Sequence, residues 1–187
     1  MVFYPTFGHR VARGWDVHIH AAVFREGVED FRKRIFMGLL RRVLRASHED
    51  LLTDIFRDRI EGFLLREQPG RRVAIQLADR AMLLPKRTRR DGHLRVKLHL
   101  SDHDIEHLTQ QGSVELDWLN IHAVTANDDP RRFVGAAQLM SPTGVSVISD
   151  IDDTLKHTAV GQRGALLSNT FFREFQAIAG MPKILRQ

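Results

Sequence analysis

Three carboxylates and a hydroxyl in one short segment are the residues of this sequence best suited to chemistry. Asp150, Asp152, Asp153 and Thr154 follow the apolar run Val145–Ile148. In an open parallel sheet, ligands bind just beyond the carboxyl ends of the strands. Two carboxylates two residues apart at such a strand end can be aimed at one substrate atom. We therefore predict a strand over Val145–Ile148 and a reactive site directly after it.

Phosphoryl transfer is the chemistry that this spacing favours. One carboxylate can attack phosphorus and form an aspartyl-phosphate, while the other protonates the leaving oxygen and later activates water. A phosphoryl group is anionic, so a divalent cation such as Mg²⁺ is needed to offset its repulsion by the carboxylates. A calcium loop would need Gly and Glu where Leu155 and Gly161 stand, and it is excluded. An acidic turn that only caps a helix is the remaining alternative.

Composition places the chain among ordinary globular proteins. It has 187 residues, 43% of them hydrophobic, a formal net charge of +5 and no cysteine. The lack of cysteine excludes disulfides and thiolate metal sites. The first twenty residues contain no apolar core, and the longest uncharged stretch is broken by Pro142 and Gly144. We predict a cytoplasmic chain without a secretory signal or membrane span, with any membrane contact peripheral.

Hydrophobic periodicity predicts the elements that precede the carboxylates. Strands are expected over residues 16–24, 73–77, 81–84, 93–100, 113–124 and 132–140, and helices over 29–45, 47–65 and 101–111. Ser47 and Ser101 are the expected N-caps. The prediction is an α+β chain with a strand-rich, β-sandwich-like domain over residues 1–140 that also carries helices. A second domain would begin at residue 141 and run to residue 187.

The string from Gly144 to Thr154, followed by Lys156, resembles a known family. It is similar to the actin-patch-associated type of phosphatidate phosphatase, within the haloacid-dehalogenase superfamily. Comparable residues elsewhere in the chain are Gly14–Trp15, His18–His20, Asp91–His93, Asn169–Phe171, Phe175 and Gly180–Pro182. The resemblance therefore spans nearly the whole chain, and the Ser149–Lys156 string is its most specific part.

The resemblance implies a Mg²⁺-dependent hydrolase that converts phosphatidate, or another anionic phosphomonoester, to the alcohol and phosphate. Asp150 would be the nucleophile and a metal ligand. Asp152 would be the general acid/base and would also contribute to the metal site, through its backbone carbonyl. Thr154 would hydrogen-bond within the loop and orient the cluster.

The sequence also departs from that family. Its later catalytic motifs lie in a Ser-Pro-Trp and a Gly-Asp-Ser-Gly segment, and neither string occurs here. The 43 residues from Val145 to Gln187 are too few for a parallel sheet, since each βαβ unit takes about 30 residues or more. We therefore expect only the first strand and nucleophile loop of an incomplete α/β haloacid-dehalogenase-like domain, in a truncated chain that is inactive alone.

Two histidine pairs could instead bind a metal. His18 and His20 share a strand face, and His103 and His107 are one helical turn apart. Neither pair has a third ligand at matching spacing, so solvated or hydrogen-bonded histidines are the favoured interpretation.

Two basic segments suggest a different class of function, a non-catalytic anion- or membrane-binding module. The run Lys86–Arg90 could contact an anionic bilayer, but no aromatic residues interleave it to stack bases, so we predict no nucleic-acid partner. The amphipathic segment Phe31–Val43 has arginines opposite its apolar stripe and could lie on a membrane. Packing of that segment against the sheet is favoured.

Overall fold

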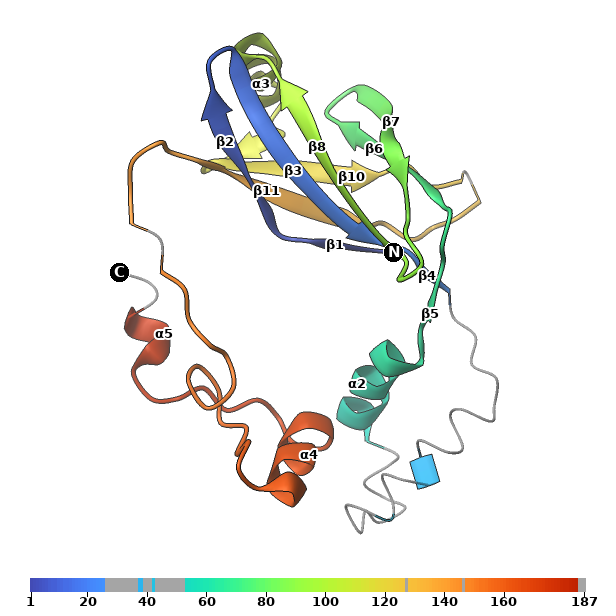
Figure 1. The fold of residues 1–187 in the computed structure, drawn as a ribbon, viewed down its shortest axis with the longest axis vertical. Helices are drawn as coiled ribbons and strands as arrows, with labels where there is room; N and C mark the ends of the chain where they lie inside the picture. Colours follow the sequence, from blue (N-terminus) through green and yellow to red (C-terminus); the bar gives the residue numbers. More distant parts are fainter. Residues whose placement is uncertain (26–36, 39–41, 43–52, 127, 146, 185–187) are drawn as a thin grey trace. The chain divides into compact units, whose positions relative to one another are not determined.

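A computed structural model describes residues 1–25, 37–38, 42, 53–126, 128–145 and 147–184. The chain divides into two compact units. Unit 1 comprises residues 1–25 and 66–144, and unit 2 comprises residues 26–65 and 145–187. The chain is strand-rich with few helices among these residues, which confirms the predicted α+β class (Figure 1).

Unit 1 is built on one nine-stranded sheet. Its strands are β1 (Val2–Tyr4), β2 (Thr6–Val11), β3 (Gly14–Ala22), β6 (Arg72–Leu77), β7 (Arg80–Arg87), β8 (His93–Leu100), β9 (Val114–Glu115), β10 (Trp118–Ala123) and β11 (Val134–Met140). The strand order is β1-β3-β2-β11-β10-β6-β7, with β8 paired to β3 and β9 to β10. Every pairing is antiparallel except that of β11 with β2. We expected a sandwich, and the strands instead form this single curled sheet (Figure 1).

Alternation of apolar and polar residues explains why these segments are strands. Along β3, Val17, Ile19 and Ala21 are buried, and they lie opposite Leu98, Val96 and Leu94 of β8 in the antiparallel register. Side chains of a strand point alternately to opposite faces, so each strand contributes one apolar face to a common core. The intervening polar residues of both strands lie on the outer face.

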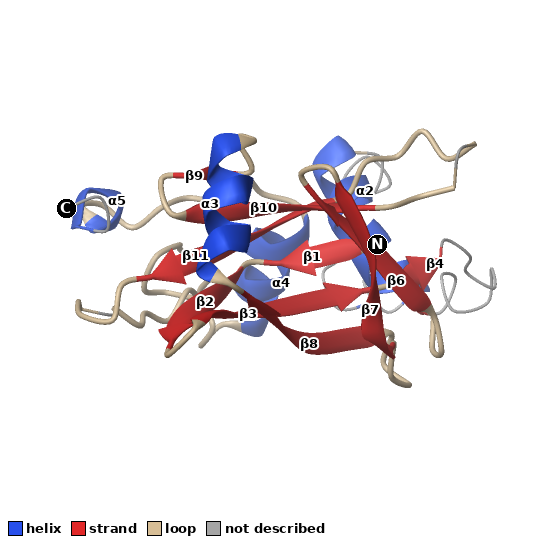
Figure 2. Cartoon of the chain, turned by 90° about the horizontal axis from the view of Figure 1, so that it is seen from above, coloured by secondary structure: helices blue, strands red, loops and turns tan. Residues whose placement is uncertain are grey.

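Helix α3 (Asp102–Gln110) lies across one end of the curled sheet (Figure 2). Ser101 is its N-cap, as predicted: the Ser101 hydroxyl accepts from Asp104 N, and the Asp104 carboxylate accepts from Ser101 N. This reciprocal capping satisfies two helix-end donors at once. Leu108 is the buried contact of the helix with the sheet core.

A small two-stranded pair flanks residues 26–65 in the sequence. Strands β4 (Phe24–Arg25) and β5 (Arg66–Glu67) are antiparallel partners and belong to unit 1. Residues 26–65 therefore leave unit 1 at β4 and return to it at β5. They are grouped with the carboxy-terminal segment in unit 2.

Unit 2 contains α2 (Asp54–Leu64), α4 (Arg163–Phe171) and the short α5 (Met181–Ile184). Its buried core is formed by Phe56, Ile60 and Phe171, and the Phe56 ring stacks on Phe172 at 5.2 Å. Because the first two residues come from α2, Phe171 ends α4 and Phe172 is the C-cap of α4, these two helices pack on each other. This core is separate from that of unit 1.

Several predicted elements differ from the structure. The strands over 16–24, 73–77, 93–100 and 132–140 are present, and β7 is longer than the predicted 81–84. Strands β1 and β2 were not predicted, because their residues show little alternation. Of the helix expected over 29–45, only residues 37–38 and 42 are described, and these are helical; its other residues and the predicted cap Ser47 lie outside the described residues. In the structure, Thr53 is the N-cap of α2 and accepts from Phe56 N.

The expected strand over Val145–Ile148 is not formed in the part of it that the structure describes. Val145, Val147 and Ile148 are 93%, 76% and 97% exposed. An apolar strand of a parallel sheet is stabilised by neighbours on both edges and by cover on both faces. The described residues of unit 2 provide no such neighbours, so the backbone here has no pairing partner.

Candidate active site

The predicted carboxylates lie in unit 2, in a tight loop that precedes α4. Asp150, Asp152 and Asp153 are all exposed, and Thr154 is half-buried within a turn. The amide of Leu155 donates to Ile151 O at 2.9 Å, and Asp153 N donates to Lys156 O at 2.8 Å. The loop is therefore closed by its own backbone before any side chain contributes.

Asp153 holds the loop shut with its side chain. Its Oδ1 accepts hydrogen bonds of 2.7 Å from Thr158 N and Ala159 N, and its Oδ2 accepts one of 2.7 Å from Val160 N. These three backbone donors hold the pKa of Asp153 below its ordinary value of 3.8. Asp153 has a φ of +58°, a conformation that Asp tolerates better than most residues. Its role in the structure is to shape the loop.

Asp152 has two polar neighbours within the same loop. Its Oδ1 accepts from Thr158 Oγ1 at 2.7 Å and lies 3.3 Å from Lys156 Nζ. The Thr158 hydrogen bond, followed by the Lys156 ammonium, lowers the pKa of Asp152. Asp152 is thus an exposed, charged carboxylate whose orientation is set by a buried threonine that is 2% exposed.

Asp150 is less constrained than Asp152. Its Oδ1 accepts from Ile151 N at 2.7 Å, and Ser149 Oγ donates to Asp150 O at 2.8 Å. Within the described part of the chain, no cation pairs with the Asp150 carboxylate. Its second oxygen accepts no hydrogen bond there, so it is open to an incoming electrophile.

Thr154 lies in the same turn, and the orienting role that the resemblance implies for it stays a prediction. Its amide is 3.4 Å from Ile151 O, and its hydroxyl makes no hydrogen bond to any described residue. The hydroxyl that orients a motif carboxylate belongs to Thr158. Thr158 and the structural role of Asp153 could not be predicted from the sequence, because both depend on how the loop turns back on itself.

The loop is fastened to the rest of unit 2 at two places. His157 N donates to Gln176 O at 2.8 Å, and Ile178 N donates to Leu155 O at 2.9 Å. Asn169 Nδ2, on α4, donates to Thr158 O at 3.3 Å. The carboxylates are therefore positioned by α4 and by the segment that follows it.

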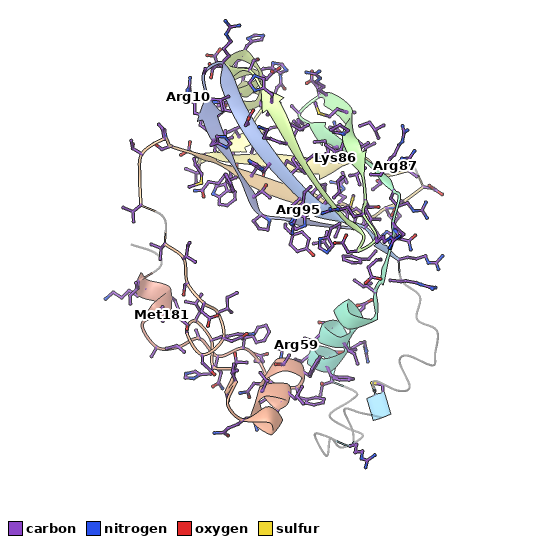
Figure 3. All side chains as sticks on the ribbon, in the orientation of Figure 1. Arg10, Arg59, Lys86, Arg87, Arg95 and Met181 are labelled. Carbon is purple, nitrogen blue, oxygen red and sulfur yellow. The ribbon has the colours of Figure 1, made fainter. Side chains whose placement is uncertain are left out.

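An aromatic ring links the loop to α2. The Phe175 ring has Lys156 Nζ 4.3 Å from its centroid and the Arg59 guanidinium 4.0 Å from its centroid. Arg59, labelled on α2 in Figure 3, also donates through Nη1 to Asn169 O at 3.1 Å and Thr170 O at 2.8 Å. These carbonyls lie in the last turn of α4, where a cation is favourable. Arg59 thereby ties α2 both to α4 and to the residue that stacks on Lys156.

Comparisons with known proteins match the segment of the chain that carries this loop. Residues 145–187 match the family model described as the catalytic domain of phosphatidate phosphatase APP1. Over 138 residues the chain is 30% identical to the protein named Phosphatidate phosphatase APP1 of Saccharomyces cerevisiae. The chain is APP1-like. The family resemblance expected from the Ser149–Lys156 string is thereby confirmed.

The extent of the match is unequal in the two proteins. It covers 69% of this APP1-like chain and 22% of the length of the yeast protein. No solved structure matches the chain. No helix within the described residues is both long and apolar enough to cross a membrane.

The histidine pairs considered from the sequence lie in unit 1. His20 Nε2 is 2.8 Å from His93 Nδ1, and the His18 ring packs near Phe7. His107 Nε2 is 3.4 Å from Asp79 Oδ1. Among the residues described, no group of three histidine or carboxylate side chains is arranged to hold a metal ion.

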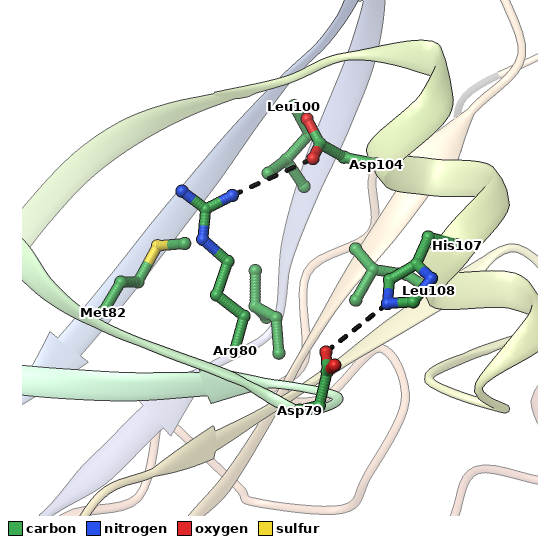
Figure 4. Close-up of a pocket in the computed structure, with 8 residues that line it drawn as sticks. Asp79, Arg80, Met82, Leu100, Asp104, His107 and Leu108 are labelled. Atoms are coloured by element: carbon green, nitrogen blue, oxygen red, sulfur yellow. Dashed lines mark hydrogen bonds and ion pairs between the residues drawn. The ribbon is translucent and has the colours of Figure 1, made fainter.

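A cavity of about 440 Å³ also lies in unit 1, next to α3 (Figure 4). It is lined by Leu77, Asp79, Arg80, Met82, Leu100, Asp104, His107 and Leu108. Its charged groups face one another, with Arg80 Nη1 3.9 Å from Asp104 Oδ1 and the His107–Asp79 pair beside it. Asp150, Asp152 and Thr154 do not line this cavity, so it is not the candidate active site.

Proposed function

We propose that this chain carries the nucleophile loop of a Mg²⁺-dependent phosphatidate phosphatase of the haloacid-dehalogenase type. The observation that carries the proposal is the match of residues 145–187 to the APP1 catalytic domain, which includes the whole Asp150–Thr158 loop. Asp150 and Asp152 stand exposed on a backbone that Asp153 and Thr158 hold in place.

Asp150 is the nucleophile in this mechanism. One Asp150 oxygen is occupied by Ile151 N, which leaves the other to attack phosphorus as the bond to the glycerol oxygen breaks. Asp152 gives a proton to the departing alcohol, which leaves as diacylglycerol. Asp152 then takes a proton from the water that hydrolyses the aspartyl-phosphate and releases inorganic phosphate.

The lowered pKa of Asp152 affects these two steps differently. A charged carboxylate suits the base step, in which Asp152 accepts a proton. For the acid step Asp152 must first gain a proton, and the approach of an anionic phosphate raises the pKa of a nearby carboxyl group. Lys156 opposes that rise, so movement of Lys156 towards the substrate phosphate would favour protonation of Asp152.

The chemistry of the loop fits Mg²⁺. Asp150 and Asp152 offer hard oxygen donors, and Mg²⁺ is commonly held by one or two carboxylates together with water and substrate phosphate. The Asp150 side chain and the oxygens of Asp152 would hold the ion. Bound there, Mg²⁺ would offset the electrostatic repulsion between the carboxylates and the phosphate.

A chimera tests the proposal. Residues 145–187 would replace the segment of the yeast phosphatase that matches the same part of the catalytic domain, and Mg²⁺-dependent release of phosphate from phosphatidate would be measured. We expect activity in the chimera, and a loss of about a thousandfold or more on Asp150→Asn. Glu174→Gln, which removes an exposed carboxylate from the same segment, is the matched control. Activity that survives Asp150→Asn would contradict the assignment.

A further inference from the structure

A second concave surface in unit 1 has a very different character from the cavity beside α3. It has a volume of about 410 Å³ and lies where β7 ends and β8 begins. Its lining residues are Lys86, Arg87, Arg89, Leu94 and Arg95. We call this surface the basic groove. Figure 3 labels three of its cations, Lys86, Arg87 and Arg95. Four of the five lining residues are cations and none is acidic.

None of the groove cations is closely paired with a carboxylate, although Asp91 in the same turn lies near enough to Arg89 for the Arg89 charge to contribute to the lowered pKa of Asp91. No ion pair among the described residues involves Lys86, Arg87, Arg89 or Arg95. Arg87 Nη1 donates to Gly70 O at 2.9 Å, and Arg95 Nε lies 3.5 Å from His20 Nε2. Arg87 also stands directly opposite Arg72 in the β6–β7 register, and like charges opposite each other are destabilising. An anion in the groove would relieve this repulsion.

The backbone around the basic groove is held in place without a ligand. Strands β7 and β8 follow each other in the chain, but β7 pairs with β6 and β8 with β3, so the two diverge. The connecting turn is closed by hydrogen bonds from Arg89 N to His93 O at 2.8 Å and from Gly92 N to Arg89 O at 3.0 Å. Gly92 has a φ of +73°, and a Cβ there would lie 2.9 Å from Val23 O. The turn that carries Arg89 therefore has a backbone conformation that depends on its hydrogen bonds and on glycine at position 92.

A buried hydroxyl fastens the same turn to the neighbouring segment. Thr88 Oγ1 donates to Gln68 O at 2.6 Å and accepts from Arg71 N at 2.8 Å. Thr88 is buried, so these bonds are shielded from water. The cations thus project from a fixed backbone, and less ordering is needed when an anion binds.

Phosphate is the anion that this arrangement suits best. Guanidinium groups bind phosphate oxygens in pairs, and three of the four cations are arginines. No aromatic ring lines the groove, so a nucleic acid would find no platform for base stacking. Leu83, on the same strand as Lys86 and Arg87, is 51% exposed. Exposed apolar and basic residues on one element are typical of a surface that contacts a bilayer.

We propose that the basic groove binds the phosphate of an anionic phospholipid headgroup at a membrane surface. The groove belongs to unit 1 and the nucleophile loop to unit 2, so this role is independent of the proposed catalysis. It gives unit 1 a function of its own, as the part of the chain that attaches to the lipid surface.

Co-sedimentation of the full chain with vesicles tests this inference. The vesicles consist of phosphatidylcholine with or without phosphatidylglycerol, an anionic lipid that is not a phosphomonoester and so does not probe the nucleophile loop. We expect binding only to the anionic vesicles, weakened by salt. The double substitution Arg87→Gln with Arg95→Gln should lower the partition coefficient about tenfold or more.

A matched pair of substitutions distinguishes binding at the basic groove from a general effect of net charge. Arg13→Gln with Arg132→Gln removes the same charge from exposed positions outside the groove and should weaken binding only about twofold. Circular dichroism establishes that each variant is folded. If the Arg87 and Arg95 variant does not fold, Lys86→Gln with Arg89→Gln replaces it.

Three results would overturn the proposal. The first is an equal loss of binding in the groove variant and the matched variant. The second is binding of inorganic phosphate at the groove, seen as arginine side-chain NMR shifts, without binding to anionic vesicles. The third is binding of single-stranded RNA by a chain that does not bind the vesicles.

Discussion

Thr158 Oγ1 donates a hydrogen bond of 2.7 Å to Asp152 Oδ1, so a buried threonine orients one of the two motif carboxylates. The same residue donates its backbone N–H to Asp153 Oδ1 at 2.7 Å. Thr158 therefore connects the Asp152 carboxylate to the Asp153 carboxylate, which closes the loop. Its side chain is 2% exposed, which protects both bonds from exchange with water.

Replacing Thr158 with valine should raise the pKa of Asp152 towards its ordinary value of 3.8. Valine has nearly the same shape but no hydroxyl, and the Thr158 bond is the largest cause of the lowered pKa. NMR titration of the Asp152 carboxyl carbon measures the change. The exposed Thr143→Val is the control and should leave the titration unchanged. An unaltered Asp152 titration in Thr158→Val would show that Lys156 alone sets it.

Asp153→Asn should open the loop, since a carboxamide offers one acceptor oxygen where the three N–H groups now share two. We expect hydrogen exchange at Thr158, Ala159 and Val160 to accelerate by about tenfold or more. The control is Asp128→Asn, an exposed aspartate in a turn of unit 1. Unchanged exchange at these amides would mean that the backbone of the loop is sufficient to hold it closed.

Low pH should open the loop in the same way as Asp153→Asn. The pKa of Asp153 is lower in the folded chain than its ordinary value of 3.8, so its contribution is fully present above that value. The contribution is lost as the pH falls through the lowered pKa. The amide shifts of Thr158 and Val160 should therefore be constant above about pH 5 and move only in stronger acid. A transition near neutral pH would contradict this account.

Sequence periodicity predicted the strands whose apolar and polar residues alternate, because one face of each is buried. Val17, Ile19 and Ala21 of β3 are an example. The single curled sheet could not be predicted in this way. It depends on the parallel pairing of β2 with β11, which joins the two ends of unit 1. That pairing produces no recognisable pattern in the sequence of either strand.

The candidate site divides along a similar line. Asp150 and Asp152 are predicted from the sequence by their spacing and their neighbours, and the structure places both on one exposed loop. The grouping of α2 with α4 could not be predicted, since it depends on Arg59 and Asn169, which are 110 residues apart. The expected strand over Val145–Ile148 failed because strand formation depends on a pairing partner as well as on β-branched residues.

Two glycine substitutions should change stability in opposite directions. In Gly135→Ala, the new methyl group would lie 2.5 Å from the Cβ of Phe3. The free energy of unfolding of unit 1 should therefore fall by about 1–3 kcal/mol. In Gly62→Ala, on α2, the new methyl group has no neighbouring atom within 4 Å. The free energy of unfolding of unit 2 should rise by about 0.5–1 kcal/mol, because alanine favours the helix more than glycine does. Urea unfolding measures both. A neutral Gly135→Ala would show that Phe3 can move away from β11.

Arg59→Gln should destabilise unit 2 by about 1–3 kcal/mol, because two carbonyl groups at the end of α4 lose a charged donor. Arg57→Gln, on the same helix, removes an exposed pair with Asp54 and should cost less than about 0.5 kcal/mol. Hydrogen exchange in α4 measures both effects. Because Arg59 also lies against the Phe175 ring on which Lys156 stacks, only Arg59→Gln should shift the Lys156 side-chain signals. Equal effects of the two substitutions would mean that α2 and α4 are held together by Phe56, Ile60 and Phe171 alone.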